Sequence, residues 1–438
     1  MTPRTAGVDR YAKYLLTGPL NVSIHLTNPT VEFSALCKAL AEHNTQIRRF
    51  KLTAHTAMMA GAIVHDVFLN AEPIQALEIL GVLLECESSD PLDAIWPRLD
   101  LVLADADTKF PNLRKLHMNS FYDSVPMLPL SASLSFMTTL VLDGSLEKVI
   151  SSPPLIAALL HCTPQLESLW MKHHYWENLK DVSDWGEVKG RSGIPPNIQL
   201  PKLKHLAVSV PGTACDLIGC ITAPALKNLH LDGSRGPTYG DSPERPDVEW
   251  SEWVVRSLHN ALNLFAQRCQ NVRRFAVTRT YLSQAGWEWI LFGEDGSRPP
   301  FPMLESISLH GMFRSVHRTW NGFDDQLLEK FARDPKIPLK RLVFLNCKFP
   351  LKASVLAEAF RASGAKELEC DMYVPQWEDE GEQLKELGVS LTRWHPSAVV
   401  EDKWWTHGHS VDVTDDEVYD LVITLRIITC AQQGHPAR

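Results

Sequence analysis

Histidine is the side chain of this sequence that most invites a chemical role, because 17 are present and neutral imidazole serves both as a metal ligand and as a general base. His173 and His174 are adjacent, and a single glycine separates His407 from His409. A metal site needs three or four converging ligands, and neither pair has a cysteine or carboxylate at a recognised spacing. We interpret both pairs as polar loop residues and expect no bound metal.

Other motifs that could carry chemistry likewise indicate no metal or catalytic site. The acidic run Asp412, Asp415, Asp416 and Glu417 lacks the alternation and the glycine of a calcium loop, and a helix start with Thr414 as N-cap explains it more simply. The sequence contains no phosphate-binding glycine loop, no nucleophile elbow and no zinc-protease helix. It therefore predicts neither an enzyme nor a bound cofactor.

The elements that would position any functional residue are set by one repeated phrase, apolar-x-x-apolar-x-apolar. It recurs about eleven times along the chain, often after a proline. The apolar triplets are Ile47-Phe50-Leu52, Ile74-Leu77-Ile79, Leu113-Leu116-Met118, Met137-Leu140-Leu142, Leu166-Leu169-Met171, Leu203-Leu206-Val208, Leu226-Leu229-Leu231, Val272-Phe275-Val277, Leu304-Ile307-Leu309, Leu339-Leu342-Phe344 and Ala365-Leu368-Cys370.

This phrase is typical of the strand of a leucine-rich repeat, in which the three apolar residues point into one continuous core. Several intervals, including 154–160, 253–265, 327–331 and 355–360, carry apolar residues at helical spacing, which predicts a helix behind each strand. The predicted fold is thus an α/β leucine-rich-repeat solenoid, a curved parallel sheet with helices on its convex side. The alternative is an ordinary doubly wound α/β domain, which does not require one phrase to recur.

The sequence predicts three regions. Residues 1–46 form an N-terminal cap, residues 47–375 form the solenoid with about eleven irregular repeats, and residues 376–438 form a C-terminal cap and tail. No linker-like change of composition divides the solenoid, and a repeat array needs none because each repeat contacts only its neighbours. The formal net charge of −9 disfavours a general affinity for nucleic acid or an anionic membrane.

The cysteines and the N-terminus indicate where the protein works. Nine cysteines are scattered without a Cys-x-x-Cys pair, as in proteins that keep their thiols reduced. The first residues lack the apolar stretch of a secretory signal, and no segment has the length of a membrane span. We therefore expect a cytoplasmic or nuclear protein.

Three phrases carry a family resemblance: Phe-Pro-Asn-Leu-Arg-Lys-Leu-His-Met at 110–118, Thr-Pro-Gln-Leu-Glu-Ser-Leu-Trp-Met at 163–171 and Ala-Pro-Ala-Leu-Lys-Asn-Leu-His-Leu at 223–231. They resemble the repeats of the fungal F-box/leucine-rich-repeat proteins, over roughly residues 45–375. In that family an F-box docks on the cullin ligase adaptor while the repeats hold the protein to be ubiquitinated. Residues 1–46 show no recognisable F-box. The resemblance thus implies adaptor binding only if an F-box is supplied upstream.

Candidate binding residues come from the inner face of the predicted strands. The positions on either side of the central apolar residue, and the one after the last, point away from the core. We select Trp170, Lys172, His205, His230 and Arg274 as a protein-binding surface, because they occupy neighbouring phrases and an exposed tryptophan is a common hot spot. Two interpretations of Trp170 stay open: it contacts a partner, or residues 172–199 cover it.

The sequence therefore predicts a protein-recognition scaffold. By resemblance it is a substrate receptor of a cullin-type ubiquitin ligase. The alternative is a stand-alone leucine-rich-repeat scaffold or inhibitor without a ligase role. A third hypothesis, an enzyme whose site uses the concave histidines, requires a nucleophile, a base and a pocket that converge.

Overall fold

The computed structural model describes most of the repeat region and short parts of both ends. The described residues are 19–26, 34–54, 57–69, 73–84, 106–119, 134–144, 160–173, 197–209, 218–232, 252–278, 280, 282–294, 298–310, 323–345, 352–363, 367–370, 390–392 and 422–426. His174, His407, His409 and the acidic run at 412–417 lie outside them. The chain divides into two compact units, and each is described by itself.

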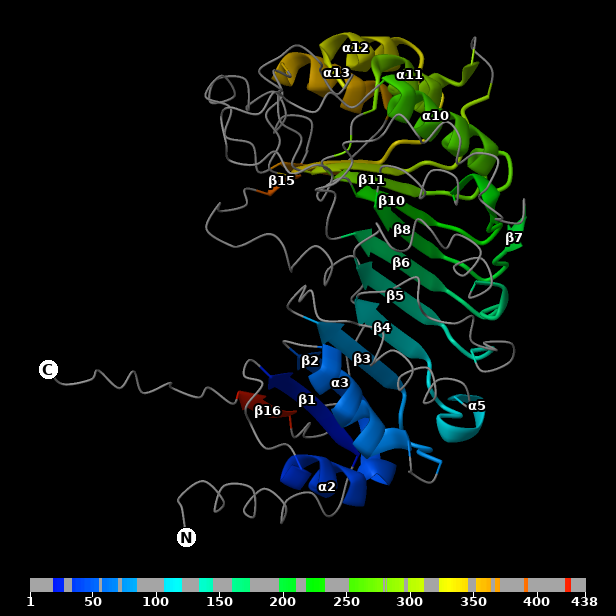
Figure 1. Cartoon of the computed structure of the whole chain (residues 1–438). Helices are drawn as coiled ribbons and strands as arrows, with labels where there is room; N and C mark the ends of the chain where they lie inside the picture. The colour runs from blue at the N-terminus through cyan, green and yellow to red at the C-terminus, as the bar shows by residue number, and fades with distance from the viewer. Residues whose placement is uncertain are drawn as a thin grey trace, which may run out of the picture. The chain divides into compact units, whose positions relative to one another are not determined.

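Unit 1 comprises residues 1–144, 162–164 and 416–438. Its strands are β1 (Leu20–Leu26), β2 (Ile47–Ala54), β3 (Ile79–Leu84), β4 (Lys115–Asn119), β5 (Thr139–Gly144) and β16 (Val422–Arg426). They lie in the order β16, β1, β2, β3, β4, β5, and neighbouring strands pair in parallel (Figure 1). Its helices are α2 (Ser34–Glu42), α3 (Ala57–Val64) and α5 (Ala106–Lys109), with the single turns η1 (Asn44–Gln46) and η2 (His65–Leu69).

Unit 2 comprises residues 145–161 and 165–415. Its main strands are β6 (Ser168–His173), β8 (His205–Ser209), β10 (Asn228–Asp232), β11 (Arg274–Thr278), β12 (Ser306–His310), β13 (Arg341–Leu345), β14 (Glu367–Cys370) and β15 (Ser390–Thr392). They pair in that order, all in parallel. The strands β7 (Ile198–Gln199) and β9 (Ile221–Thr222) form a separate small parallel pair.

The central apolar residues of the phrases line up in register within each unit. In unit 1, Leu80, Leu116 and Leu140 are successive partners. In unit 2 the partners are Leu169, Leu206, Leu229, Phe275, Ile307, Leu342, Leu368 and Leu391. The residues of this series from Leu169 to Leu342 are at most 2% exposed. The phrase therefore marks the strands of parallel sheets, as the sequence predicts, and the chain is an α/β protein.

These buried residues define the core face of each sheet. We call the other face, which carries the residues on either side of the central apolar residue, the polar face. In unit 2 the core face meets the helices α10 (Glu252–Ala266), α11 (Gln284–Phe292), α12 (Asp325–Arg333) and α13 (Ala353–Ser363). Phe275 of β11 lies 6.0 Å from Trp287 of α11, and Trp287 lies 5.1 Å from Phe323, measured between ring centroids. The aromatic rings thereby join strand and helix in one core.

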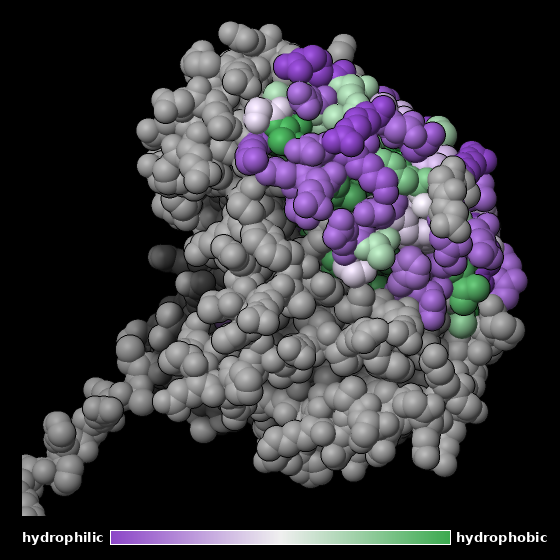
Figure 2. Space-filling model, turned by 90° about the horizontal axis from the view of Figure 1, so that it is seen from above, coloured by the Kyte–Doolittle hydropathy of each residue, from purple (hydrophilic) through white to green (hydrophobic). Residues whose placement is uncertain are grey.

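The outward surface over these helices is mainly hydrophilic, with small apolar areas among the polar ones (Figure 2). Two helices are also fixed at their starts, because the side chains of Ser283 and Asp324 accept hydrogen bonds from the backbone amides of Gly286 and Leu327. Such caps satisfy amides that have no partner within the helix. Both helices therefore have defined starts, and α12 covers the interval 327–331, where the spacing predicts a helix.

The structure corrects the expected second phrase, Ile74-Leu77-Ile79. Leu80 pairs in register with Phe50 on one side and Leu116 on the other. The phrase therefore begins at Leu77 and continues through Leu80 and Val82. Ile74 instead opens the preceding turn, because the amide of Leu77 donates to its carbonyl oxygen at 3.4 Å.

This shift changes which residues of β3 lie on the polar face. The expected frame placed Ala76, Glu78 and Leu80 there. The observed register places Ile79 beside Arg49 and Gly81 beside Lys51, whereas Leu80 is fully buried on the core face. The segment 74–84 is so rich in apolar residues that its pattern fits both frames, and only pairing with the neighbouring strands distinguishes them.

The turn before each strand explains why proline often precedes the phrase. In five repeats the amide of the first apolar residue donates to the carbonyl three residues earlier, at 2.9–3.1 Å. The acceptors are Phe110, Leu134, Leu200, Ala223 and Phe301, all buried. Proline follows four of these acceptors, at the turn position where its fixed φ fits and its missing amide is not needed.

The ends of the chain contribute strands as well. Residues 1–46, expected as a cap, include β1, whose Val22 and Ile24 pair with Phe50 and Leu52 and are buried with them. From residues 376–438, β15 pairs with β14 and β16 pairs with β1. Among the described residues no helix is both long and apolar enough to cross a bilayer.

Candidate binding face

The polar face of unit 2 holds the residues that the sequence singles out. On it, His205 of β8, Asn228 of β10 and Arg274 of β11 are consecutive register partners. One row further along the strands, Trp170 of β6 is followed by Ala207 and then by His230. Neighbouring strands are roughly 4.8 Å apart, so these side chains occupy one continuous surface over four strands.

Two hydrogen bonds fix the histidines of this surface. Asn228 Nδ2 lies 2.6 Å from His205 Nδ1, and Nε2 of His230 lies 2.8 Å from Thr278 Oγ1. Burial, followed by the nearby cations Lys204 and Arg274, lowers the pKa of His205. His205 is therefore neutral at physiological pH, and its Nδ1 can accept the hydrogen bond from the amide of Asn228.

The face becomes buried at β12. Ser306, Ser308 and His310 are each less than a tenth exposed, so β12 is buried on both sides. Burial, and secondly the nearby His230, lowers the pKa of His310 to about 3. A neutral, enclosed imidazole cannot serve as a cation for a ligand, and we assign His310 to structure rather than to binding.

Trp170 lies half-buried at the β6 end of the face. Its indole Nε1 is enclosed, while its register neighbour on β8 is the small Ala207, which leaves room for a large ring. A half-buried tryptophan is compatible both with a partner contact and with a partial cover. The backbone of Lys172 belongs to β6, but its side chain lies outside the described part.

Sequence reasoning missed a ladder of charged residues one position before the polar face, at the start of each strand. Its members in unit 2 are Glu167, Lys204, Lys227, Arg273, Glu305 and Lys340. Each backbone amide from Lys204 to Lys340 donates to the preceding member's carbonyl oxygen, at 2.7–2.9 Å. The signal was present in the sequence, since all six follow the first apolar residue of a phrase.

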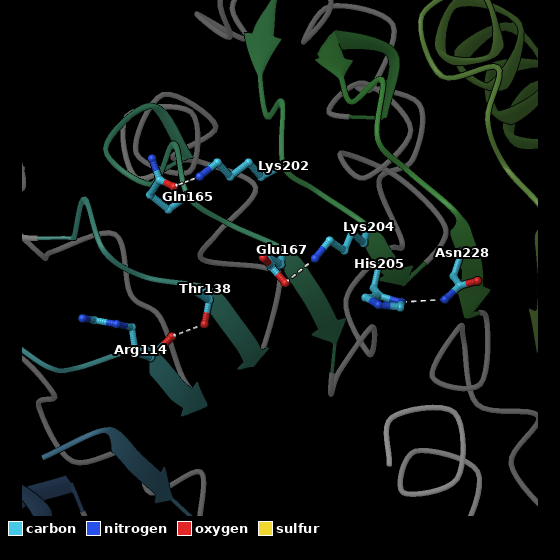
Figure 3. Close-up of polar contacts among 8 residues, drawn as sticks. All are labelled: Arg114, Thr138, Gln165, Glu167, Lys202, Lys204, His205 and Asn228. Atoms are coloured by element: carbon cyan, nitrogen blue, oxygen red, sulfur yellow. Dashed lines mark hydrogen bonds and ion pairs between the residues drawn. The ribbon is translucent and has the colours of Figure 1, made fainter. Parts of the chain in front are cut away.

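Ion pairs link the side chains of this ladder only in part. Lys204 Nζ lies 2.8 Å from Glu167, and Lys340 Nζ lies 2.9 Å from Glu305 (Figure 3 shows the first pair, with Lys202 beside Gln165 in the preceding turn). Arg273 lies 3.9 Å from Glu305. The pKa of Glu305 falls below its usual range because Lys340 hydrogen-bonds to it and Arg273 is near.

Two cations at the start of these strands have no carboxylate partner among the described residues. Lys227 and Arg274 are both exposed, and they lie on the adjacent strands β10 and β11. Lys204 and Arg273 flank them, and their partners Glu167 and Glu305 are 42% and 27% exposed, so solvent screens these pairs in part. The start of β8, β10 and β11 therefore presents net positive charge beside His205 and Asn228.

The described part of unit 2 bears on two kinds of chemistry, a metal site and a reactive thiol. No group of three histidine, cysteine, aspartate or glutamate residues could hold a metal ion within the described ranges. Burial raises the pKa of Cys269 to about 11, and Cys269 Sγ accepts a hydrogen bond from the Ala223 amide at 3.3 Å. A protonated, enclosed thiol is a poor nucleophile, so we assign Cys269 to the core.

No protein-family model matches this chain, and a search of curated proteins found no significant match.

Proposed function

We propose that the chain is a leucine-rich-repeat protein that recognises a protein partner on the polar face of unit 2. The observation that supports this most directly is the register that places Trp170, His205, His230 and Arg274 on one face of four consecutive parallel strands. A parallel sheet whose core face is covered by helices leaves this second face as the surface on which side chains vary without disturbing the core.

The chemistry of the face suits a segment of protein that carries acidic side chains. Asn228 and His230 are held in place by hydrogen bonds, so little side-chain entropy remains to be lost on binding. Lys227 and Arg274 supply exposed positive charge, and an arginine can bind a carboxylate through two parallel hydrogen bonds. An aromatic anchor beside such cations is a common composition for a binding hot spot.

Replacement of Trp170 tests the proposal. Partners are first captured with the wild-type chain, and the affinity of a captured partner is then measured by calorimetry for Trp170→Ala and for Lys336→Ala, an exposed control away from this face. We expect Trp170→Ala to weaken binding by about 2 kcal/mol or more with an unchanged melting temperature, and the control to bind as wild type. Intact affinity with lowered stability would mean that Trp170 is covered and structural.

The finer role that we propose is substrate reception for a cullin-type ubiquitin ligase, on the strength of the resemblance in the repeat phrases. Residues 34–42 form α2 with the sequence Ser-Ala-Leu-Cys-Lys-Ala-Leu-Ala-Glu, which lacks the opening of an F-box. We therefore expect the cullin adaptor not to bind this chain alone, and to bind after an F-box is fused upstream. Failure of the fusion to recruit the adaptor and ubiquitinate a captured partner would favour a stand-alone scaffold or inhibitor.

A further inference from the structure

A second polar surface, in unit 1, carries positive charge around a gap in the side chains. Arg49 and Lys51 lie on β2, while Lys115 and His117 lie on β4. The strand between them, β3, contributes Ile79 and Gly81 to the same face. The two residues on each outer strand are roughly 7 Å apart, and the outer strands are roughly 10 Å apart, so the four basic side chains stand at the corners of a small rectangle.

The charges of Arg49, Lys51 and Lys115 are not compensated by ion pairs among the described residues. The neighbouring Arg48, by contrast, pairs with Glu78 at 3.0 Å. The Nε atom of Arg49 is enclosed and has no hydrogen-bond partner in the described part, although an enclosed charged donor without a partner is costly.

Gly81 provides the gap at the middle of the rectangle. Its register partners on this face are Lys51 and His117, and the next residue in the row is Val141 of β5. A Cβ atom added at Gly81 would meet Lys51 Cγ at 3.6 Å and no atom closer, which is ordinary van der Waals contact. A residue with a Cβ atom would therefore fit at this position without a clash. The effect of the glycine is to leave space between two basic side chains.

We infer that Arg49, Lys51, Lys115 and His117 bind a phosphoryl group above Gly81. Three cations within this area match the charge of a dianion better than that of a single carboxylate. Arginine and lysine are also the usual ligands of phosphate oxygens, with arginine able to donate two parallel hydrogen bonds. The inference rests on unit 1 alone and is independent of the protein-binding face of unit 2.

The phosphoryl group has two possible sources, a free polyphosphate or a phosphorylated side chain of a protein. Pyrophosphate represents the first. A flexible glycine-serine peptide with one phosphoserine, compared with the same peptide without the phosphate, represents the second. Binding of either phosphorylated probe supports the inference and identifies the source, whereas binding of neither at millimolar concentration would overturn it.

Two variants locate the site on this face. Arg49→Gln removes one charge, and Gly81→Val fills the gap with a residue suited to a strand while leaving every charge in place. We expect each to raise the dissociation constant of the bound probe at least tenfold in calorimetric titration. Lys38→Gln, which removes an exposed cation of α2, is the matched control and should bind as wild type.

Circular dichroism and thermal melting establish that each variant is folded before titration. If Arg49→Gln does not fold, Gly81→Val carries the test, because its Cβ makes only ordinary van der Waals contacts. Wild-type affinity in folded Gly81→Val would overturn the inference, as would an equal loss in Lys38→Gln, which would indicate general attraction between the probe and the protein's cations.

Discussion

The two polar faces are built on the same repeated phrase, yet they differ in how their charges are satisfied. In unit 1, Arg49, Lys51 and Lys115 surround Gly81 without ion pairs among the described residues. In unit 2, hydrogen bonds hold His205 and His230, and the neighbouring β12 is buried on both sides. One surface leaves a gap among cations, and the other presents fixed polar groups with an aromatic side chain.

The comparison shows that the core and the surface of these sheets are specified separately. Register requires apolar side chains only at three positions of each phrase, and these positions are buried in both units. The intervening positions face away, so their chemistry changes from strand to strand without loss of the core. Two surfaces of different chemistry can therefore arise on the same repeated phrase.

The largest losses of stability are expected at a buried position of the phrase that the two units share. Leu140 of unit 1 and Leu229 of unit 2 occupy the same position of the phrase and are at most 1% exposed. Each change to alanine should lower the free energy of unfolding by about 2–5 kcal/mol, through lost burial and a residual cavity. Chemical denaturation of both variants measures this.

The control is Leu264→Ala, because Leu264 of α10 is 52% exposed and should cost little. A large cost in one unit with almost none in the other would show that the two sheets do not share a core design.

A pH effect is expected in unit 2, at His310. The pKa of His310 is about 3 in the folded protein and about 6.5 when unfolded, so between these values the unfolded chain binds the additional proton. The contribution of His310 to the free energy of unfolding is therefore present above the unfolded pKa and is lost as the pH falls. Between pH 7.5 and 5.5 this loss is about 1.4 kcal/mol. Denaturation of His310→Gln at both pH values should lack this loss. An equal decline in wild type and variant would contradict the assignment.

A smaller loss of stability, of similar size in the two units, is expected on replacing either of two asparagines. Asn112 Nδ2 donates to the carbonyl of Gln75 in unit 1, and Asn271 Nδ2 donates to that of Pro224 in unit 2, both at 2.8 Å. Each links the turn of one repeat to the turn of the previous one. Replacement by alanine should cost about 1 kcal/mol in either unit, measured by thermal unfolding. No effect at both positions would mean that water replaces these bonds without loss.

The smallest effects should come from the charged ladder. Glu78 pairs with Arg48 in unit 1, and Glu305 contacts Lys340 and Arg273 in unit 2. These pairs lie at the surface and are partly exposed, so Glu78→Gln and Glu305→Gln should each change the free energy of unfolding by less than about 1 kcal/mol. The loss should shrink further in high salt. A larger, salt-independent loss for Glu305→Gln would show that this carboxylate is more than a surface partner.

The sequence predicted the elements well because the phrase combines three apolar positions with a turn and a helix. Leu169, Leu206 and Leu229 could be assigned to adjacent strands from spacing alone. The frame at Ile74 was wrong because the segment 74–84 is apolar at both alternatives. The pairing of β16 with β1 could not be predicted, since nothing local to either strand specifies a partner so distant in sequence.

The candidate site was only partly accessible to the same reasoning. The positions of His205, His230 and Arg274 on one face follow from the phrase. Their hydrogen bonds to Asn228 and Thr278, and the burial of His310, depend on side chains from other strands and could not be derived from spacing. Gly81 illustrates the limit most clearly, because its place between Lys51 and His117 appears only once the frame of β3 is known.

Site-specific photo-crosslinking tests the central claim, that a partner binds on the polar face of unit 2, most directly. A photoreactive residue is placed at Arg274 on the polar face, or at Leu264 on the exposed side of α10. With a partner captured by the wild-type chain, we predict crosslinks from position 274 and none from position 264. Crosslinks from position 264 without any from position 274 would place the partner on the helices and contradict the account.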